Sequence, residues 1–417
     1  MKIAILSDLH IGPGAKTRDM CPVERLDGAN FSPASVRAKE FSEEFVDFVK
    51  SRKLTADYLM VPGDVTDGAH PTEVRMASAF LMDVAKAFAV PENRILFVPG
   101  NHDVDWSLFD PHDTTGIKWS HRYMALNSDQ FLFSRVNKNA RRGTLFSDAY
   151  YTLWEFDDLL VLGYNSSATD CAEDKGRCGN IEQDHIDKLK TCLQALKIEN
   201  NRRLKIFMIH HHLRGFKLPF SSDRDFTQAN NPESLITVLQ DNKFDFIVNG
   251  HRHYSFFDAV NSKIPMLCAG SFSAKLMTDW EGYVLNQFHV IDIEKTRRWP
   301  LSSRGIVRSW SHTMKGWQAS PGLEVFGGEP HERAFGASLE DKKLADRIRR
   351  CLQKLCTERR DFSWRSDVAA MVSDVCFLCE AKDKIVKWCK ETVFAERRGD
   401  VFIEENGDIH FVSKGGV

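Results

Sequence analysis

FVPGNHDVDW, residues 97–106, joins the end of a predicted strand to a group of reactive side chains. The strand-forming residues stop at Pro99-Gly100. An amide, an imidazole and a carboxylate follow at once, from Asn101, His102 and Asp103, and each can bind a metal or exchange a proton. In α/β sheets, ligands bind at the carboxyl ends of strands, so this stretch predicts a functional site at a sheet edge.

The rest of the first 295 residues has an alternating pattern of apolar runs and amphipathic stretches. Continuous apolar strands between helices indicate strands that are covered on both faces. We expect strands at residues 2–7, 57–61, 94–98, 150–155, 159–164, 204–209, 244–248, 264–269 and 283–293, and helices at 35–53, 73–89, 181–197 and 232–241.

Four other predicted strand ends carry similar polar blocks: Asp8-x-His10, Gly63-Asp64, His210-His211-His212 and Gly250-His251-x-His253. Because the carboxyl ends of neighbouring strands meet at one edge, blocks far apart in the sequence can converge. In extended chain, residues i and i+2 point the same way, which predicts that both members of each x-separated pair face one place. The glycines before these blocks predict sharp turns of the backbone.

The blocks supply seven candidate metal ligands: Asp8, His10, Asp64, Asn101, one histidine of the triplet, His251 and His253. Seven side chains exceed what one tetrahedral ion needs and suit two ions that share a carboxylate. Four imidazoles favour Mn, Fe, Zn, Ni or Co over Ca or an all-oxygen Mg site. A single block is more often a surface pair or a hydrogen-bonded histidine, and it is the ordered set of five that indicates a metal site.

The length of 417 residues predicts one large domain and a second unit. A net charge of −2 gives no global preference for nucleic acid or membrane. The N-terminal apolar run is too brief for a signal peptide, and no apolar run is long enough to cross a bilayer. Ten cysteines without a secretory context predict reduced thiols in the cytoplasm. We expect Cys376 and Cys379 to pack in a helical core, with a structural zinc site as the alternative.

Two long segments interrupt the pattern, at residues 11–34 and at 104–148, and the second is expected to contain a helix. Between residues 118 and 142 the chain has one acid, Asp129, and six basic residues: Lys118, Arg122, Arg135, Lys138, Arg141 and Arg142. After residue 295 the pattern changes to a strand near 304–310, helices at 338–356, 365–379 and 380–395, and a hairpin around Asn406-Gly407. The predicted domains are therefore 1–295, with a helical insertion at about 104–148, and 296–417.

The ordered blocks D-x-H, G-D, G-N-H-D, H-H and G-H-x-H resemble those of the calcineurin-like metallophosphoesterase superfamily over about residues 1–295. The resemblance implies an α/β fold of two stacked mixed β-sheets flanked by helices, here with a C-terminal α+β appendage. It also implies a first metal at Asp8, His10 and His253, a bridging Asp64, and a second metal at Asn101, a triplet histidine and His251. Because relatives place the ligand two residues before a proline, which Leu213 replaces here, His211 is the expected ligand and His210 the alternative.

If the resemblance holds, His102 is expected to stabilise the phosphoryl oxygens and to protonate the leaving alkoxide. Asp103 is expected to orient and charge that imidazole. The alternative is that Asp103 only caps the following turn.

The expected reaction is hydrolysis of a phosphodiester by a metal-bridging hydroxide, with two divalent ions and manganese as the first choice in vitro. The wording GDVTDGAHP and PGNHDV resembles the bacterial cyclic-nucleotide phosphodiesterase branch, which implies a nucleotide-type substrate. One alternative is a DNA or RNA nuclease, supported by the basic insertion and the C-terminal region, although residues 296–417 hold only 22 Lys and Arg against 18 Asp and Glu. The other alternative is a non-catalytic scaffold on the same fold.

Overall fold

The structure is a computed structural model, and the chain forms two compact units. One unit contains residues 1–295 and 307–332, and the other contains 296–306 and 333–417. The structure describes residues 1–27, 29, 31, 40–108, 121–128, 131–138, 150–171, 178–215, 228–261, 264–276, 284–295, 303–321, 330–359, 361–380, 382–394, 399–404 and 408–413. Among these residues, no helix has both the length and the apolar character needed to span a bilayer.

The first sheet of the large unit is mixed and has the order β12-β11-β10-β1-β2-β3, with β13 also paired to β11. Strands β1, β2 and β3 run parallel, while β10 is antiparallel to β1. The strands are β1 (Lys2–Ile5), β2 (Tyr58–Val61), β3 (Ile95–Phe97), β10 (Gln287–Lys295), β11 (Ser303–Thr313), β12 (Gly316–Ala319) and β13 (Glu332–Phe335). By residue, 303–306 of β11 and 333–335 of β13 are assigned to the small unit.

The second sheet has the order β4-β5-β6-β7-β9-β8. Its four central strands run parallel, and β4 and β8 are antiparallel to their neighbours. The strands are β4 (Tyr151–Glu155), β5 (Leu159–Tyr164), β6 (Leu204–Ile209), β7 (Phe246–Asn249), β8 (Phe256–Val260) and β9 (Ile264–Cys268). Every residue of β5 and β6 is buried, as their continuous apolar runs predict.

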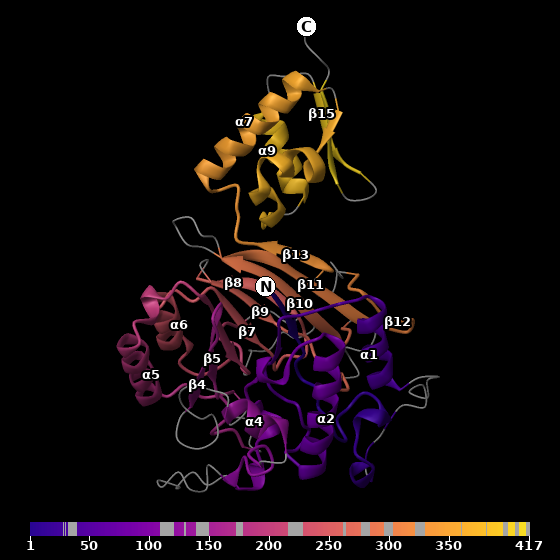
Figure 1. Cartoon of the computed structure of the whole chain (residues 1–417), viewed down its shortest axis with the longest axis vertical. Coiled ribbons are helices and arrows are strands. Elements are labelled where there is room, and N and C mark those ends of the chain that lie inside the picture. The colour runs from indigo at the N-terminus through magenta and orange to yellow at the C-terminus, as the bar shows by residue number, and fades with distance from the viewer. Residues whose placement is uncertain are drawn as a thin grey trace. The chain divides into compact units, whose positions relative to one another are not determined.

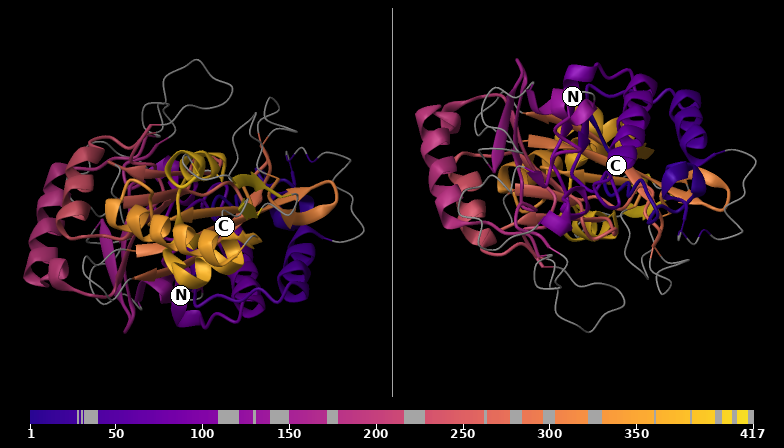
Figure 2. Two further views of the ribbon diagram at one scale, coloured as in Figure 1. Left: turned by 90° about the horizontal axis from the view of Figure 1, so that it is seen from above. Right: turned by 90° about the horizontal axis from the view of Figure 1, so that it is seen from below.

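Helices flank both sheets of the large unit. They are α1 (Phe41–Ser51), α2 (Pro71–Ala87), α4 (Leu132–Lys138), α5 (Gln183–Ala195) and α6 (Pro232–Asp241), with 3-10 turns at Arg18–Met20, Val23–Arg25, Glu92–Arg94, Asn101–Asp103, Trp106–Leu108 and Ile198–Asn200. Figure 1 shows α5 and α6 beside the second sheet, and α1 and α2 on the opposite side of the unit. The same separation is visible from above and below (Figure 2). The expected fold of two mixed sheets between helices is confirmed.

Aromatic and aliphatic side chains fill the spaces between these layers. Phe45 of α1 packs edge-on against Phe288 of β10, with ring centroids 5.0 Å apart. On the other side, one apolar cluster joins α5 and α6 to the second sheet and includes Leu189, Leu239 and Phe207. The two layers of helices therefore hold the sheets through buried apolar contacts, and the strand ends carry the polar residues.

The small unit is α+β. It contains α7 (Lys342–Glu358), α8 (Ala369–Met371), α9 (Lys382–Thr392) and a three-stranded antiparallel sheet of β14 (Asp361–Ser363), β16 (Ile409–Ser413) and β15 (Gly399–Ile403), in that order. The pairing of β15 with β16 agrees with the expected hairpin, whose turn at Asn406-Gly407 lies outside the described residues. An apolar core joins Leu352 of α7, Cys389 of α9 and Phe411 of β16.

The expected helix at 365–379 and its core cysteines are wrong. A π-helical turn at Trp364–Val368 and α8 are followed by a 3-10 turn at Ser373–Phe377. After α8 the backbone changes from α-helical to 3-10 geometry, which has three residues per turn. Val375 and Leu378, three residues apart, are therefore buried, while Cys376 and Cys379 are exposed. Among the described residues, neither cysteine belongs to a group with metal-ligand geometry.

Candidate metal centre

The polar blocks lie at the carboxyl ends of strands from both sheets. Asp8 and His10 follow β1, Asp64 follows β2, and Asn101 follows β3 in the first sheet. His210 follows β6 in the second sheet, and His251 and His253 follow β7. The site is therefore assembled from segments that are far apart in the sequence, with His253 lying 243 positions after His10.

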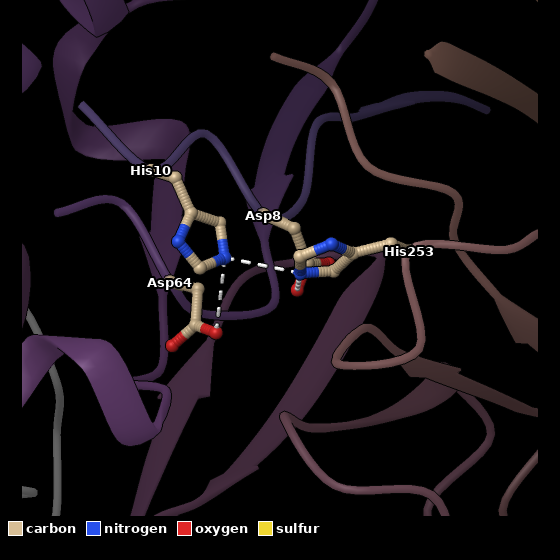
Figure 3. A group of neighbouring side chains, drawn as sticks. All are labelled: Asp8, His10, Asp64 and His253. Atoms are coloured by element: carbon tan, nitrogen blue, oxygen red, sulfur yellow. Dashed lines mark hydrogen bonds and ion pairs between the residues drawn. The ribbon is translucent and has the colours of Figure 1, made fainter. Parts of the chain in front are cut away.

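A first donor group contains Asp8, His10, Asp64 and His253, whose ligand atoms all lie within 4.8 Å of one another (Figure 3). His10 Nε2 is 3.0 Å from His253 Nε2 and 3.5 Å from Asp64 Oδ2. His253 Nε2 is also 3.5 Å from Asp8 Oδ1. Two imidazoles and two carboxylates thus present their donor atoms to one small volume.

A second donor group contains Asp64, His210 and His251, and it shares Asp64 with the first. Asp64 Oδ2 is 3.2 Å from His210 Nε2. The side-chain oxygen of Asn101 completes this group, at 3.1 Å from His210 Nε2 and 2.9 Å from His251 Nδ1. Two donor groups that share one carboxylate are the arrangement that two neighbouring cations require.

The outer contacts of these histidines fit metal ligation. His10 Nδ1 lies 3.4 Å from Asp67 Oδ1, and His210 Nδ1 lies 2.8 Å from the carbonyl oxygen of Pro62. An acceptor at Nδ1 favours the tautomer that leaves Nε2 with a lone pair, and such partners commonly orient metal-binding histidines. The nitrogen and oxygen donors, without a thiolate, suit the divalent transition metals that the sequence predicts.

The backbone of the donor residues is strained. Asp8, His10, Asp64, His251 and His253 all have positive φ, at 52°, 47°, 52°, 78° and 56°. Non-glycine residues adopt this left-handed region at a cost of about 1–3 kcal/mol each, and such residues concentrate at functional sites. The expectation that the pairs meet through extended chain is therefore wrong, because left-handed backbone and not a pleated strand turns each pair inward.

Two glycines permit close packing against the donors. A Cβ on Gly100 would lie 2.1 Å from Asp64 Oδ1, and a Cβ on Gly250 would lie 2.6 Å from Asp8 Oδ2. Any side chain at either position would displace a carboxylate. Glycine is needed at these two positions because the backbone lies close to a carboxylate, and not because the backbone is left-handed.

The pKa values of the donors are shifted in both directions. Burial would raise the pKa of Asp64, but the imidazoles of His210 and His102 hold it well below its usual value. Burial and neighbouring imidazoles lower the pKa of His251 and of His253 well below the usual value. Burial would also lower the pKa of His10 and of His210, but the Asp64 carboxylate outweighs it and raises them to about 10 and about 9. A cation bound by these two imidazoles would therefore displace their protons.

His102 lies beside the first donor group with 29% of its side chain exposed. Its ring meets the His10 ring edge-on, with centroids 4.5 Å apart. His102 Nδ1 is 2.9 Å from the backbone oxygen of Asp67, and its backbone N–H donates to Asp64 Oδ1 at 2.8 Å. The ring is thus held at the edge of the centre without belonging to either of the two groups that share Asp64.

The Asp103 carboxylate faces its own loop rather than the His102 ring. It accepts hydrogen bonds of 2.9 Å from Gly100 N, Thr66 N and Thr66 Oγ1. Among the described residues, no hydrogen bond joins it to the His102 ring, so these contacts favour the alternative, a capping role, and the orienting role stays a prediction. Three donors of the surrounding loops already bond to the Asp103 carboxylate, and these bonds fix its direction.

The carboxylate near His102 is Asp67, which sequence reasoning missed. Asp67 Oδ1 lies 3.4 Å from His10 Nδ1 and 3.9 Å from His102 Nδ1. Its position three residues after Asp64, in GDVTD, was the available signal.

The structure brings His210, not His211, into the donor group. His211 is fully buried, with Nδ1 2.8 Å from Ser166 Oγ and Nε2 3.4 Å from Asp170 Oδ2. Consecutive side chains after a strand point in different directions, so one position decides which ring reaches Asp64. Without the proline of the related motif, that position could not be read from the sequence.

Two basic residues of the insertion are described with their partners, one buried and one at the surface. The buried guanidinium of Arg122 donates to the carbonyl oxygens of Ala168 and Asp170. Arg135 pairs with Glu92 at 2.5 Å. Lys118, Arg141, Arg142 and the side chain of Lys138 lie outside the described residues.

A sequence profile described as calcineurin-like phosphoesterase matches residues 1–255. No match was found among curated proteins. Among solved structures, a dimetal phosphatase from Danio rerio is 12% identical with a TM-score of 0.46, covering 74% of this chain and 95% of that one.

Two other solved structures have lower TM-scores. A predicted phosphoesterase from Streptococcus pneumoniae is 13% identical with a TM-score of 0.32, covering 81% of this chain and 97% of that one. A zinc complex of Vps29 from Entamoeba histolytica is 10% identical with a TM-score of 0.31, covering 77% and 97%.

Proposed function

The chain belongs to the calcineurin-like phosphoesterase family, and we propose that it is a dinuclear metal-dependent phosphodiesterase that hydrolyses a nucleotide-type substrate. The observation that supports this most is the pair of donor groups that share Asp64. Seven side chains from five strand ends would hold the two ions: Asp8, His10, Asp64, Asn101, His210, His251 and His253.

When bound, two divalent ions would polarise the phosphoryl oxygens and lower the pKa of water to near neutrality. His102 would then bind a phosphoryl oxygen and, as the imidazolium, deliver a proton to the leaving oxygen, because its partly exposed ring borders the first donor group. Burial and His10 lower the pKa of this ring, which makes the imidazolium a stronger acid. Asp67 would hold the His102 ring through its backbone oxygen and place a carboxylate nearby.

We propose a diester substrate because the motifs GDVTDGAHP and PGNHDV resemble those of the cyclic-nucleotide phosphodiesterase branch. Manganese is the metal chosen for the assays. The nuclease alternative loses part of its support, because the buried guanidinium of Arg122 is engaged within the protein. The scaffold alternative is disfavoured by a complete donor set. Ten free cysteines support the proposed location in the reducing cytoplasm.

The test compares wild type, Asp64→Ala and Asp157→Asn with bis-p-nitrophenyl phosphate and manganese. Asp157 is an exposed carboxylate in the turn between β4 and β5, so its variant controls for loss of one negative charge. Wild type and Asp157→Asn are expected to release p-nitrophenolate. Asp64→Ala is expected to lose about 10³-fold or more in kcat/KM, since Lewis-acid stabilisation is worth several kcal/mol.

Absence of product from all three proteins with Mn, Fe, Zn, Ni and Co would reject the phosphodiesterase and revive the scaffold. A substrate panel then separates the enzyme classes. Turnover of cyclic nucleotides or dinucleotides supports the proposal, whereas cleavage confined to single- or double-stranded DNA, with binding that falls steeply with salt, supports the nuclease.

A further inference from the structure

His211 occupies an enclosed position next to the second donor group. Its side chain is fully buried, and its ring centroid lies 4.3 Å from that of His251 and 5.1 Å from that of His210. Its two ring nitrogens face the segment 165–171 that follows β5, with Nδ1 2.8 Å from Ser166 Oγ and Nε2 3.4 Å from Asp170 Oδ2. The Ser166 hydroxyl is within hydrogen-bond distance of Nδ1, whereas the Asp170 carboxylate lies close to Nε2 without a hydrogen bond. Rotation of the ring would lose both of these contacts.

The segment that faces His211 is itself fixed. The Arg122 guanidinium donates to two of its carbonyl oxygens, and the Tyr123 hydroxyl exchanges hydrogen bonds with the Asn165 side chain at 2.9 and 3.2 Å. The part of the insertion that surrounds Arg122 therefore holds the loop that carries Asp170. A fixed loop gives His211 a rigid support.

The neighbouring chain is also shaped to the His211 ring. Gly179 has a φ of +69°, and a Cβ at this position would lie 2.4 Å from His211 Cγ. The His251 ring also packs against the His211 ring, with ring centroids 4.3 Å apart. Packing this close leaves the imidazole of His211 one position, between a donor histidine and a backbone that tolerates only glycine.

We propose that His211 and Asp170 are positioning residues for the second donor group, and this rests on the proposed function in that the group binds a metal ion. His211 is bonded directly to His210 along the chain, so fixing its ring on Ser166 and Asp170 fixes the backbone from which His210 reaches Asp64. The same ring packs against the ring of His251. His211 therefore sets the geometry of two ligands without binding the metal itself.

Metal titration separates a positioning residue from a ligand. Manganese binding to the full chain is measured by calorimetry and by electron paramagnetic resonance for wild type, His210→Ala, His211→Gln and Asp170→Asn. Wild type is expected to bind two ions and His210→Ala one. His211→Gln and Asp170→Asn are expected to keep two ions, with the second bound about 10–100-fold more weakly, as for loss of other outer partners of metal ligands.

His289→Gln is the matched control. His289 is also fully buried and also lies 2.8 Å from a serine hydroxyl, Ser309 Oγ, but it belongs to neither donor group. We expect its variant to bind both ions as wild type does. A double variant, His211→Gln with Asp170→Asn, is expected to weaken the second ion no more than the stronger single change, because the two residues act through one contact.

Two results would overturn the inference. If His211→Gln binds one ion while His210→Ala binds two, His211 is the ligand. If both His211→Gln and Asp170→Asn bind two ions with wild-type affinity, the contact does not position the group.

Circular dichroism reports folding, and if His211→Gln fails to fold, the metal affinity of Asp170→Asn decides between positioning and no role. Two bound ions without phosphodiester turnover would reject the proposed function and leave this inference standing, whereas a wild type that binds no metal rejects both.

Discussion

The two sides of the metal centre differ in their access to solvent. On one side, the side chains of His102 and His253 are 29% and 25% exposed, and that of Asp67 is 22% exposed. On the other side, His210 is fully buried and Asn101 is 3% exposed, and His251 is partly exposed. Each donor group thus has one partly exposed histidine, and the side that also carries His102 and Asp67 is the more open of the two.

This difference separates the tasks of the two sides. The open side contains a ring that can reach a leaving group, and a carboxylate that contacts both that ring and His10. The buried side contains residues whose contacts end on other protein groups, such as His211 on Ser166 and Asp103 on Thr66. We expect changes on the open side to alter catalysis and changes on the buried side to alter metal affinity or folding.

Among the variants that compare the two sides, the largest effect is expected at His102. In His102→Ala, kcat for an ester with an alkoxide leaving group should fall about 10²–10⁴-fold, because the proton donor is lost. The loss should be smaller with bis-p-nitrophenyl phosphate, since p-nitrophenolate leaves without a proton. Steady-state kinetics with the two substrates measure this, and metal titration should still find two ions.

His121→Ala is the control, because His121 is exposed and belongs to none of the candidate metal groups. An equal loss for both leaving groups would show that His102 does not act as the acid. Loss of a metal ion would show that it is a ligand. Either result would remove the functional contrast between the two sides.

A smaller effect is expected at Asp67. Asp67→Asn removes the charge behind His10 while keeping a similar shape, and it should weaken the ion of the first donor group by about 10–100-fold. Manganese titration measures the change, with the exposed-carboxylate variant Asp157→Asn as reference. If affinity and rate both match the reference, the contact from Asp67 to His10 at 3.4 Å contributes nothing to the centre.

Much of the fold could be predicted because buried parallel strands have continuous apolar sequences. β5 illustrates this, since all six of its residues are buried, and β6 is buried along its whole length even at Lys205. β8 was not predicted, because four of its five residues are only partly buried and give no regular pattern. The helix predicted at 365–379 failed for the opposite reason: apolar spacing was present, but the chain left the α-helical period after α8.

At the site, the sequence indicated which residue types gather but not the direction of each side chain. The structure brings together Asp8, His10, Asp64, Asn101, His251 and His253, and their roles as ligands stay predictions. The choices between His210 and His211, and between Asp67 and Asp103, depend on backbone angles and hydrogen bonds after the strand ends. In a strand, side chains alternate between the two faces, so their directions can be predicted from the sequence. Residues with left-handed backbone follow these strands and interrupt that alternation.

The smallest effect on catalysis is expected at Asp103, on the buried side. Asp103→Asn leaves one acceptor oxygen where the carboxylate accepts three hydrogen bonds, and it turns an amide N–H₂ toward donors in a buried loop. An unsatisfied buried donor costs about 1–3 kcal/mol, so the free energy of unfolding should fall by that amount. Urea unfolding measures it, and kcat of the folded variant should remain within a few-fold of wild type. If instead kcat falls as far as in His102→Ala while the free energy of unfolding is unchanged, Asp103 acts on the His102 ring, and the division between an open catalytic side and a buried supporting side fails.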